Sequence, residues 1–268
     1  MSAVQGRLSY RDLAQLAVTG GWPALLDSSP AEALDYNWSY IEDLCASDIR
    51  TATGVRHDPV RLKRLLASIA RNVASQATIQ KLTGDVAANG ASTDRDTVRT
   101  YLDALETVFA IENLPAWRTP LCSRTRLRSG VKLHFADPAM ACAALGINPK
   151  RLAGNPEYFG QVFESMVVRD LRVYVEPQRG QVFHYRDETG LEADAIIEYA
   201  DGTWAAIEAK LGSAMVETAE ANLLRITHER IDTARVGQPA FLAIITATEY
   251  GYTLPSGVHV IPLGALCP

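Results

Sequence analysis

Several features that would place a protein in a specialised class are missing from this 268-residue sequence. No apolar run approaches the roughly 20 residues that a membrane-spanning helix needs, and the N-terminus lacks the basic and then apolar layout of a secretory signal. The four cysteines and five histidines are scattered without paired spacing, which argues against a zinc site or a disulfide framework. No G-x-x-x-x-G-K-S/T loop occurs, so we expect no ATP hydrolysis by this chain alone. These absences favour a cytoplasmic protein without membrane contact.

What is present is the composition of a globular protein, with 47% hydrophobic and 21% charged residues. The length suffices for two ordinary domains. The net charge of −5 is uneven, because residues 1–150 carry +2 and residues 151–268 carry −7. Overall charge therefore does not favour nucleic acid, and local basic patches would have to hold it. An acidic C-terminal half suits a carboxylate cluster that gathers divalent cations.

Three regions follow from the patterning. Residues 1–56 predict a helical segment that includes a helix over 31–49 and is too short to fold alone. Residues 57–150 predict three helices and then two short extended pieces (111–117 and 131–135), which is the order of a winged helix. The first helix is expected to begin near Pro59, the second at Thr78, and the third after a cap at Ser92 or Thr93. The first helix is expected to bury Leu62, Leu65, Leu66 and Ile69. Residues 151–268 predict a helix from Asn155-Pro156 to about Tyr174, a meander of strands, a long helix and further strands. The expected fold class is α/β (α+β overall), with a helical N-terminal half and then a mixed sheet flanked by helices. The expected strands are 181–186, 191–199, 203–211, 241–246 and 259–262, with the long helix at 215–234.

The winged-helix pattern raises the question of DNA binding. The third helix of this region carries four acids against two arginines, and an acidic helix in a major groove would be repelled by phosphate. The loop between the extended pieces instead has five basic residues with no acid between them. One interpretation is that this loop contacts a phosphate backbone. The equal alternative is a solvated loop or a contact with an acidic partner surface. The basic residues are Arg118, Arg124, Arg126, Arg128 and Lys132.

Acidic side chains interrupt two otherwise apolar strands. Because side chains alternate along a strand, Asp194 shares one face of 191–199 with Glu192, and Glu208 shares one face of 203–211 with Lys210. A two-residue turn at Asp201-Gly202 would put Asp194 and Glu208 on different faces. A three-residue loop, 200–202, with Gly202 left-handed places Asp194 opposite Glu208, and we predict this register. It also brings Glu192 opposite Lys210.

Two converging carboxylates suit Mg²⁺ or Mn²⁺, which are hard ions that prefer oxygen. Such an ion polarises a phosphoryl oxygen and lowers the pKa of a bound water. We expect Lys210 to position that water or to stabilise charge on the phosphate. Glu164, on the preceding helix, is expected to supply a further metal ligand or a water contact. Glu192 and Arg186 are expected to support the site from its periphery.

A helix Glu, then Asp, then Glu-x-Lys on adjacent strands resembles the PD-(D/E)XK nuclease superfamily. The matching residues are Glu164, Asp194 and Glu208-Ala209-Lys210. More narrowly, the chain resembles an uncharacterised C-terminal domain family that follows an AAA-type ATPase core in prokaryotic ATP-binding proteins. That resemblance covers nearly the whole chain and is carried by Gly20-Gly21-Trp22-Pro23, Thr97–Leu102, Asp137-Pro138, Phe159–Ser165, Tyr185-Arg186, Glu192-Ala193-Asp194 and Ile207–Lys210. Two features depart from the pattern: the phosphate-binding loop is absent, and Ala193 stands where the superfamily often has Pro.

The resemblance implies a restriction-endonuclease-like sheet in 151–268, a winged-helix-like domain in 57–150, and in 1–56 a helical remnant after an ATPase core that this sequence lacks. It implies a Mg²⁺-dependent nuclease acting on DNA or RNA, associated with an ATPase domain or subunit. The alternative is a catalytically inactive module that mediates protein or nucleic-acid contacts for an ATPase. The structural alternative for Asp194, Glu208 and Lys210 is a surface ion-pair network on a half-exposed sheet, and the coincidence with Glu164 on the helix favours the nuclease-type site over it.

Overall fold

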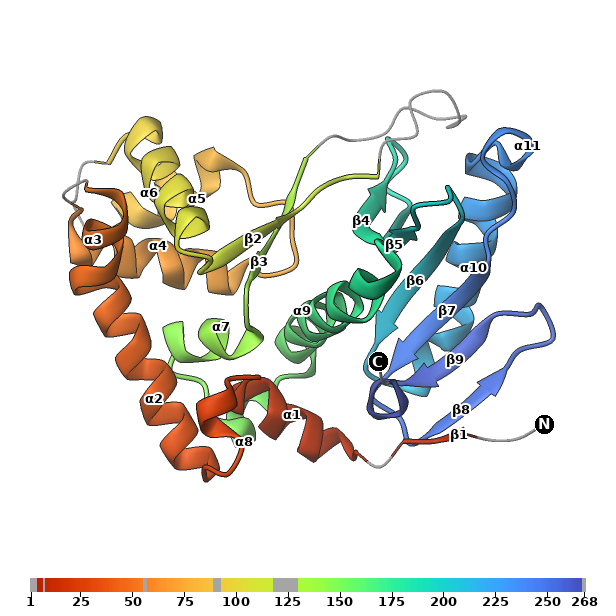
Figure 1. Ribbon diagram of the computed structural model, residues 1–268, viewed down its shortest axis with the longest axis horizontal. Helices are drawn as coiled ribbons and strands as arrows, with labels where there is room; N and C mark the ends of the chain where they lie inside the picture. Colours follow the sequence, from red (N-terminus) through yellow and green to blue (C-terminus); the bar gives the residue numbers. More distant parts are fainter. Residues whose placement is uncertain (1–3, 7, 55–56, 89–92, 118–129, 267–268) are drawn as a thin grey trace. The chain divides into compact units, whose positions relative to one another are not determined.

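The computed structural model describes residues 4–6, 8–54, 57–88, 93–117 and 130–266. The chain divides into two compact units (Figure 1). We call residues Ala14–Asn113 with Lys132–Ser165 the helical unit. Residues Met1–Leu13, Leu114–Val131 and Met166–Pro268 form the sheet unit. The predicted fold class, a helical N-terminal half followed by a mixed sheet, is confirmed.

The first helices form a continuous run after a short turn. Ser29 begins α2 with a capping box, because its hydroxyl accepts the Glu32 N–H while the Glu32 carboxylate accepts the Ser29 N–H. Gly54, at φ +70°, ends the run in the left-handed conformation that glycine adopts without strain. The predicted helix over 31–49 is therefore present and extends further. The elements are α1 (Tyr10–Thr19), η1 (Pro23–Leu25), α2 (Pro30–Asp43), the π-helical η2 (Leu44–Asp48) and α3 (Ile49–Thr53).

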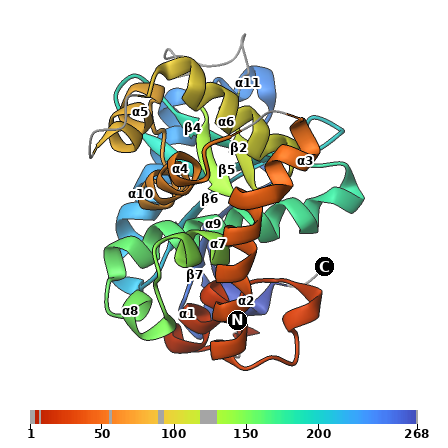
Figure 2. The ribbon, with the colours of Figure 1, turned by 90° about the vertical axis from the view of Figure 1, so that its left-hand side faces the viewer.

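Three capped helices and two strands follow, in the predicted order. Asp58, Thr78 and Asp94 cap the helices through side-chain oxygens that accept backbone N–H groups. The predicted apolar stripe of the first helix (Leu62, Leu65, Leu66, Ile69) is fully buried, and Figure 2 shows the three helices grouped together. The elements are α4 (Pro59–Arg71), α5 (Ile79–Ala87), α6 (Arg95–Thr107), β2 (Ile111–Leu114) and β3 (Lys132–Phe135), with β2 and β3 forming a two-stranded sheet.

Asp137 ties distant segments of the helical unit together. One carboxylate oxygen caps α7 (Pro138–Ala144) at Ala139, and the other accepts the Gly21 N–H at 2.8 Å. Gly20 has φ +82°, and a Cβ there would lie 2.8 Å from Asp137 Oδ1, so only glycine fits this approach. The helices α8 (Pro149–Ala153) and α9 (Pro156–Val175) follow. None of the helices in the described ranges combines the length and apolar character needed to cross a membrane.

The sheet unit contains one mixed sheet in the order β1-β8-β9-β7-β6-β5-β4. The meander β4-β5-β6 is antiparallel, while β7 runs parallel to both β6 and β9. The predicted strands are all present, and the sequence reading missed β1 and β8 at one edge. The strands are β1 (Val4–Gln5), β4 (Gln181–Arg186), β5 (Glu192–Glu198), β6 (Trp204–Lys210), β7 (Phe241–Thr246), β8 (Tyr250–Thr253) and β9 (His259–Pro262).

Helix α10 (Val216–Arg225) packs on this sheet through Val216, Ala219 and Leu223, which join one apolar cluster with Trp204. The predicted helix over 215–234 is interrupted near its end instead of being continuous. The π-helical η5 (Ile226–Arg230) follows α10, and Ile231 then leaves the helical region at φ −99°, ψ 135° to bury its side chain. The remaining short elements are α11 (Thr233–Val236), η3 (Glu176–Gln178), η4 (Ser213–Met215) and η6 (Leu263–Ala265).

Candidate active site

The turn between β5 and β6 has the predicted three-residue form. The Tyr199 N–H donates to the Thr203 carbonyl at 2.8 Å, and Gly202 has φ +83°. Ladder pairs from Glu198 with Trp204 to Ala195 with Ile207 have the register that places Asp194 next to Glu208. The predicted register is confirmed, and a two-residue turn is excluded because it would shift every pair by one residue.

A bulge modifies the simple alternation expected for β5. The register with β4 shifts between Phe183 and Tyr185, so a step of three residues along β5, from Ala193 to Ile196, faces a step of two residues along β4. Ala193 and Ile196, an odd number of residues apart, therefore share one apolar cluster. Within the bulge, the Asp194 carboxylate accepts the Ala209 N–H at 2.8 Å through Oδ2. The bulge thus aims Asp194 at the backbone of β6 and fixes its orientation.

The three predicted catalytic side chains of the strands converge. The Lys210 ammonium lies 2.5 Å from Glu208 Oε2 and 3.3 Å from Asp194 Oδ2. Exposure decreases from 23% for the Lys210 side chain to 9% for Asp194 and 2% for Glu208. The carboxylates therefore lie in the protein interior, and Lys210 is the part of this group that most reaches the surface.

Burial and neighbouring charges shift the pKa values of Glu208 and Lys210. Burial, with the nearby charge of Asp194, raises the pKa of Glu208 to about 8. Burial by itself lowers the pKa of Lys210, but Asp194 and Glu208 together outweigh it and hold that pKa above its ordinary value. Glu208 Oε1 is buried and has no hydrogen-bond partner among the described residues. A buried acceptor without a donor is costly, and a bound cation would relieve that cost.

The side chains at this site suit a hard cation that takes only one or two of its ligands from the protein. Within the described ranges, no group of three or more His, Cys, Asp and Glu side chains is placed to hold a metal. Mg²⁺ commonly uses one or two carboxylates and retains several waters. Asp194 and Glu208, with the unpartnered oxygen of Glu208, fit that pattern.

The two peripheral residues pair with each other. Arg186 and Glu192 are opposite one another on β4 and β5, with Arg186 Nη1 3.4 Å from Glu192 Oε2. The sequence pattern placed Glu192 opposite Lys210, whereas among the described residues the Lys210 ammonium pairs with Asp194 and Glu208. Attraction to two buried carboxylates directs the flexible Lys210 side chain inward.

Glu164 and Lys132 form an ion pair within the helical unit. Lys132 Nζ lies 2.6 Å from Glu164 Oε1, and the two side chains are 4% and 14% exposed. The expectation that Lys132 belongs to a phosphate-contacting loop is not met, because its ammonium is buried against a carboxylate. Arg118, Arg124, Arg126 and Arg128 lie outside the described residues.

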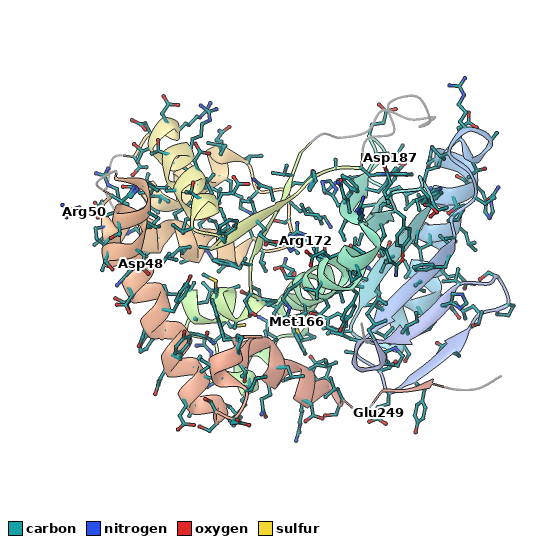
Figure 3. All side chains as sticks on the ribbon, in the orientation of Figure 1. Asp48, Arg50, Met166, Arg172, Asp187 and Glu249 are labelled. Atoms are coloured by element: carbon teal, nitrogen blue, oxygen red, sulfur yellow. The ribbon has the colours of Figure 1, made fainter. Side chains whose placement is uncertain are left out.

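Sequence reasoning missed one buried acid of the sheet unit. Asp187, labelled in Figure 3 after β4, is 0% exposed. Its Oδ1 accepts the Thr189 N–H, the Thr189 hydroxyl and the Leu191 N–H, and Arg230 Nε lies 3.6 Å from Oδ2. The signal was an Asp-x-Thr turn, which recurs at Asp201-Gly202-Thr203. Asp187 therefore closes the turn between β4 and β5.

Comparison with known proteins gives three findings. No curated protein matches the chain. A solved structure described as the refined half-complex from a tetradecameric assembly of Thermococcus gammatolerans McrB AAA+ hexamers with bound McrC is similar at 10% identity, covering 78% of this chain and 72% of that chain. Its TM-score of 0.26 supports no conclusion about fold or function. The family model described as domain of unknown function (DUF4143) matches residues 159–266.

That match covers most of the sheet unit's contiguous C-terminal part, including Asp194, Glu208 and Lys210. A second family model covers residues 10–151, which is more than half of the sequence. The chain therefore belongs to the family described as domain of unknown function (DUF8612).

Proposed function

We propose that this chain hydrolyses phosphodiester bonds of DNA or RNA with Mg²⁺ or Mn²⁺. The observation that carries the proposal is the convergence of two buried carboxylates on one ammonium, with Glu208 Oε1 unpartnered among the described residues. An ordinary surface ion pair would be solvated and would leave no buried acceptor unpaired. Strongly perturbed groups of this kind are concentrated at functional sites.

Each residue has a distinct role in the proposed site. Asp194 and Glu208 would hold the ion, and the backbone N–H of Ala209 keeps Asp194 in place. The ion, when bound, would supply Lewis-acid activation of a phosphoryl oxygen and of water. Lys210 would leave the carboxylates, once their charge is balanced, and donate hydrogen bonds to the phosphate as its negative charge develops.

Glu164 has a narrower proposed role. The Glu164 carboxylate forms an ion pair with Lys132 in the helical unit, so binding of an ion by Glu164 would compete with that pair. We therefore base the proposed chemistry on Asp194, Glu208 and Lys210. The four arginines at 118, 124, 126 and 128 remain a proposed contact for the nucleic-acid backbone, since phosphate binding needs local positive charge in an acidic protein.

The second candidate is a non-catalytic module that contacts an ATPase domain or subunit. The Lys210 ammonium at 2.5 Å from Glu208 favours it, because this contact already balances part of the carboxylate charge without an ion. The ATPase partner itself rests on the resemblance of the chain to domains that follow an AAA-type core. The two candidates differ in whether a divalent ion enters the site.

Cleavage and ion binding are measured on the full chain. Supercoiled plasmid and labelled single strands are incubated with Mg²⁺, with Mn²⁺ or with EDTA. We expect ion-dependent cleavage that Glu208→Gln and Lys210→Ala each reduce by at least 100-fold, on the order of losing one electrostatic contact of the transition state. The matched control, Glu217→Gln, changes an exposed acid of α10 and keeps full activity.

Two results would contradict the proposal. Cleavage that persists in Lys210→Ala would indicate a contaminating nuclease. Equal thermal stabilisation of wild type and Glu208→Gln by Mg²⁺ would show that no ion binds at Glu208, and the second candidate would then stand.

A further inference from the structure

Lys210 contacts both carboxylates of the candidate ion site through a single atom. Its Nζ lies 2.5 Å from Glu208 Oε2 and 3.3 Å from Asp194 Oδ2. A Mg²⁺ ion shared by the same carboxylates would bind their oxygens at about 2.0–2.1 Å. The ammonium and the ion therefore compete for the same oxygens, and holding both there would bring two positive charges into close contact.

The charges of this group oppose the binding of both cations together. An ion needs deprotonated ligands, and two ionised carboxylates balance a divalent ion completely. A retained Lys210 ammonium would add a surplus positive charge beside carboxylate side chains that are only 9% and 2% exposed. Because water screens charges poorly at such depth, the repulsion is several times stronger than in bulk water. Ion binding thus requires that the ammonium moves away.

Lys210 is the member of the group that is able to move. Asp194 is held by the Ala209 N–H, which donates to its Oδ2 at 2.8 Å, and the Glu208 side chain is almost fully enclosed. Lys210 is the last residue of β6, and its side chain is 23% exposed. A flexible aliphatic chain carries its charge, so rotation of that chain is sufficient to bring the ammonium toward solvent.

An ordinary structural ion pair does not account for this arrangement. Lys210 contacts Oε2 of Glu208, while the shielded Oε1 has no hydrogen-bond partner within the part of the chain that the structure describes. Buried acceptors are otherwise almost always paired, and leaving one open is costly. The ammonium therefore balances the charge of the site only in part and leaves room for a second cationic partner.

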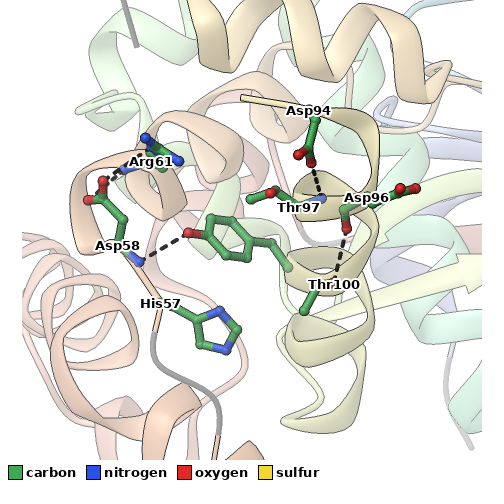
Figure 4. Close-up of a pocket in the computed structure, with 8 residues that line it drawn as sticks. His57, Asp58, Arg61, Asp94, Asp96, Thr97 and Thr100 are labelled. Carbon is green, nitrogen blue, oxygen red and sulfur yellow. Dashed lines mark hydrogen bonds and ion pairs between the residues drawn. The ribbon is translucent and has the colours of Figure 1, made fainter. Parts of the chain in front are cut away.

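The pocket between the starts of α4 and α6 shows the contrast (Figure 4). Each of the three acids that line it already has a role within the fold. Asp94 caps α6, Asp58 pairs with Arg61, and Asp96 pairs with Arg99. These acids need no external cation, whereas the ion site has an open carboxylate oxygen.

We propose, on the basis of the proposed function, that Lys210 is an internal competitor of the divalent ion, so that the ion and the phosphate backbone of a nucleic-acid strand bind cooperatively. A phosphate that pairs with the Lys210 ammonium removes it from the carboxylates. The ion, in turn, releases the ammonium for the phosphate. Each ligand therefore raises the affinity for the other by the same factor, and without a strand the ammonium keeps the affinity for the ion low.

Ion binding is measured by isothermal titration calorimetry of Mn²⁺ into the full chain at pH 8, which limits competition by protons. Lys210→Met removes the ammonium and keeps much of the side-chain volume. We expect this variant to bind Mn²⁺ at least tenfold more tightly than wild type, although its cleavage activity is lost. The matched control Lys150→Met changes an exposed lysine and should bind Mn²⁺ like wild type, whereas Glu208→Gln should lose the binding.

Cooperativity is measured on wild type, so it does not depend on the folding of a variant. The Mn²⁺ titration is repeated with a saturating phosphorothioate oligonucleotide, which keeps the backbone charge and resists hydrolysis, and with a neutral methylphosphonate oligonucleotide of the same sequence. After subtraction of Mn²⁺ binding to the oligonucleotide alone, the charged strand should tighten binding by at least fivefold, the lower end of usual coupling between sites. The neutral strand should have no effect, and the coupling should be absent in Lys210→Met.

The outcomes separate this competition from the proposed function. Equal Mn²⁺ affinity in wild type and a folded Lys210→Met, or a wild-type affinity that the charged strand leaves unchanged, would overturn the competition while the ion site stands. No Mn²⁺ binding by either protein, with or without a strand, or binding that Glu208→Gln retains, would overturn the proposed function and the competition together.

Discussion

Replacing Glu208 with glutamine removes a buried carboxylate whose pKa is raised from 4.5 to about 8, first by burial and then by Asp194. The folded protein therefore keeps a proton that the unfolded chain releases above pH 4.5. As the pH rises from about 4.5 to about 8, wild-type stability must fall, because the folded state binds more protons than the unfolded state. Glutamine has no such proton, so this contribution disappears in the variant.

The magnitude follows from the pKa difference. At about 1.4 kcal/mol per pH unit, the full interval corresponds to an upper limit of roughly 5 kcal/mol. Because Asp194 and Lys210 share the charge of the group, we expect about half of this, roughly 2–3 kcal/mol, between pH 5 and pH 8.

Urea unfolding in EDTA at pH 5, 6, 7 and 8, followed by tryptophan fluorescence, measures this effect. The difference in free energy of unfolding between Glu208→Gln and wild type should increase in favour of the variant as the pH rises. Glu217→Gln, an exposed acid, serves as the control and should parallel wild type. In a parallel series without EDTA, free Mg²⁺ at ten times its dissociation constant should stabilise wild type at pH 8 by about 1.4 kcal/mol. Parallel pH curves for wild type and Glu208→Gln would refute the reasoning.

Three further changes test other parts of the structure by denaturant unfolding. Lys132→Met should destabilise the protein by about 3 kcal/mol, because it removes the ammonium that pairs with the buried Glu164 carboxylate. Adding Glu164→Gln should restore part of this stability, and a double variant without any recovery would contradict a buried ion pair. Phe109→Gly should stabilise the protein by roughly 0.5–1 kcal/mol, because Phe109 has φ +55° and its side chain is 77% exposed. A loss of stability would mean that the Phe109 ring makes stabilising contacts with the rest of the protein. Ser29→Ala should cost about 1 kcal/mol by removing the capping box with Glu32, whereas an unchanged midpoint would show that the cap is dispensable.

Local rules were sufficient for much of the fold. Pro59 and Thr78 mark two helix starts that the structure confirms. The third helix is capped by Asp94 and not by Thr93, and Ser92 lies outside the described residues. The apolar spacing that predicted helix α4 corresponds to a fully buried stripe. The choice of a three-residue loop ending at Gly202 predicted the register of two strands and hence the meeting of Asp194 and Glu208. These features depend on neighbours in sequence, so the sequence contains their cause.

Other features required knowledge of distant segments. Strand β8 has a weak apolar pattern and is defined by its pairing with β1 and β9. The bulge at Asp194 depends on alignment with β4, which no local signal predicted. The interruption after α10 arises because Ile231 reaches a core that other strands build.

The sequence by itself determined the positions of most helices and strands, the register of β5 with β6, and the residues that meet at the candidate site, since backbone propensity, capping and side-chain alternation act over a few residues. Only the tertiary structure decided which charges are buried and with whom. It paired Lys132 with Glu164, directed Lys210 onto both carboxylates and left Glu208 Oε1 without a hydrogen-bond partner among the described residues. Burial and partner choice depend on the packing of segments far apart in the chain, and electrostatic energies change severalfold between water and a protein interior.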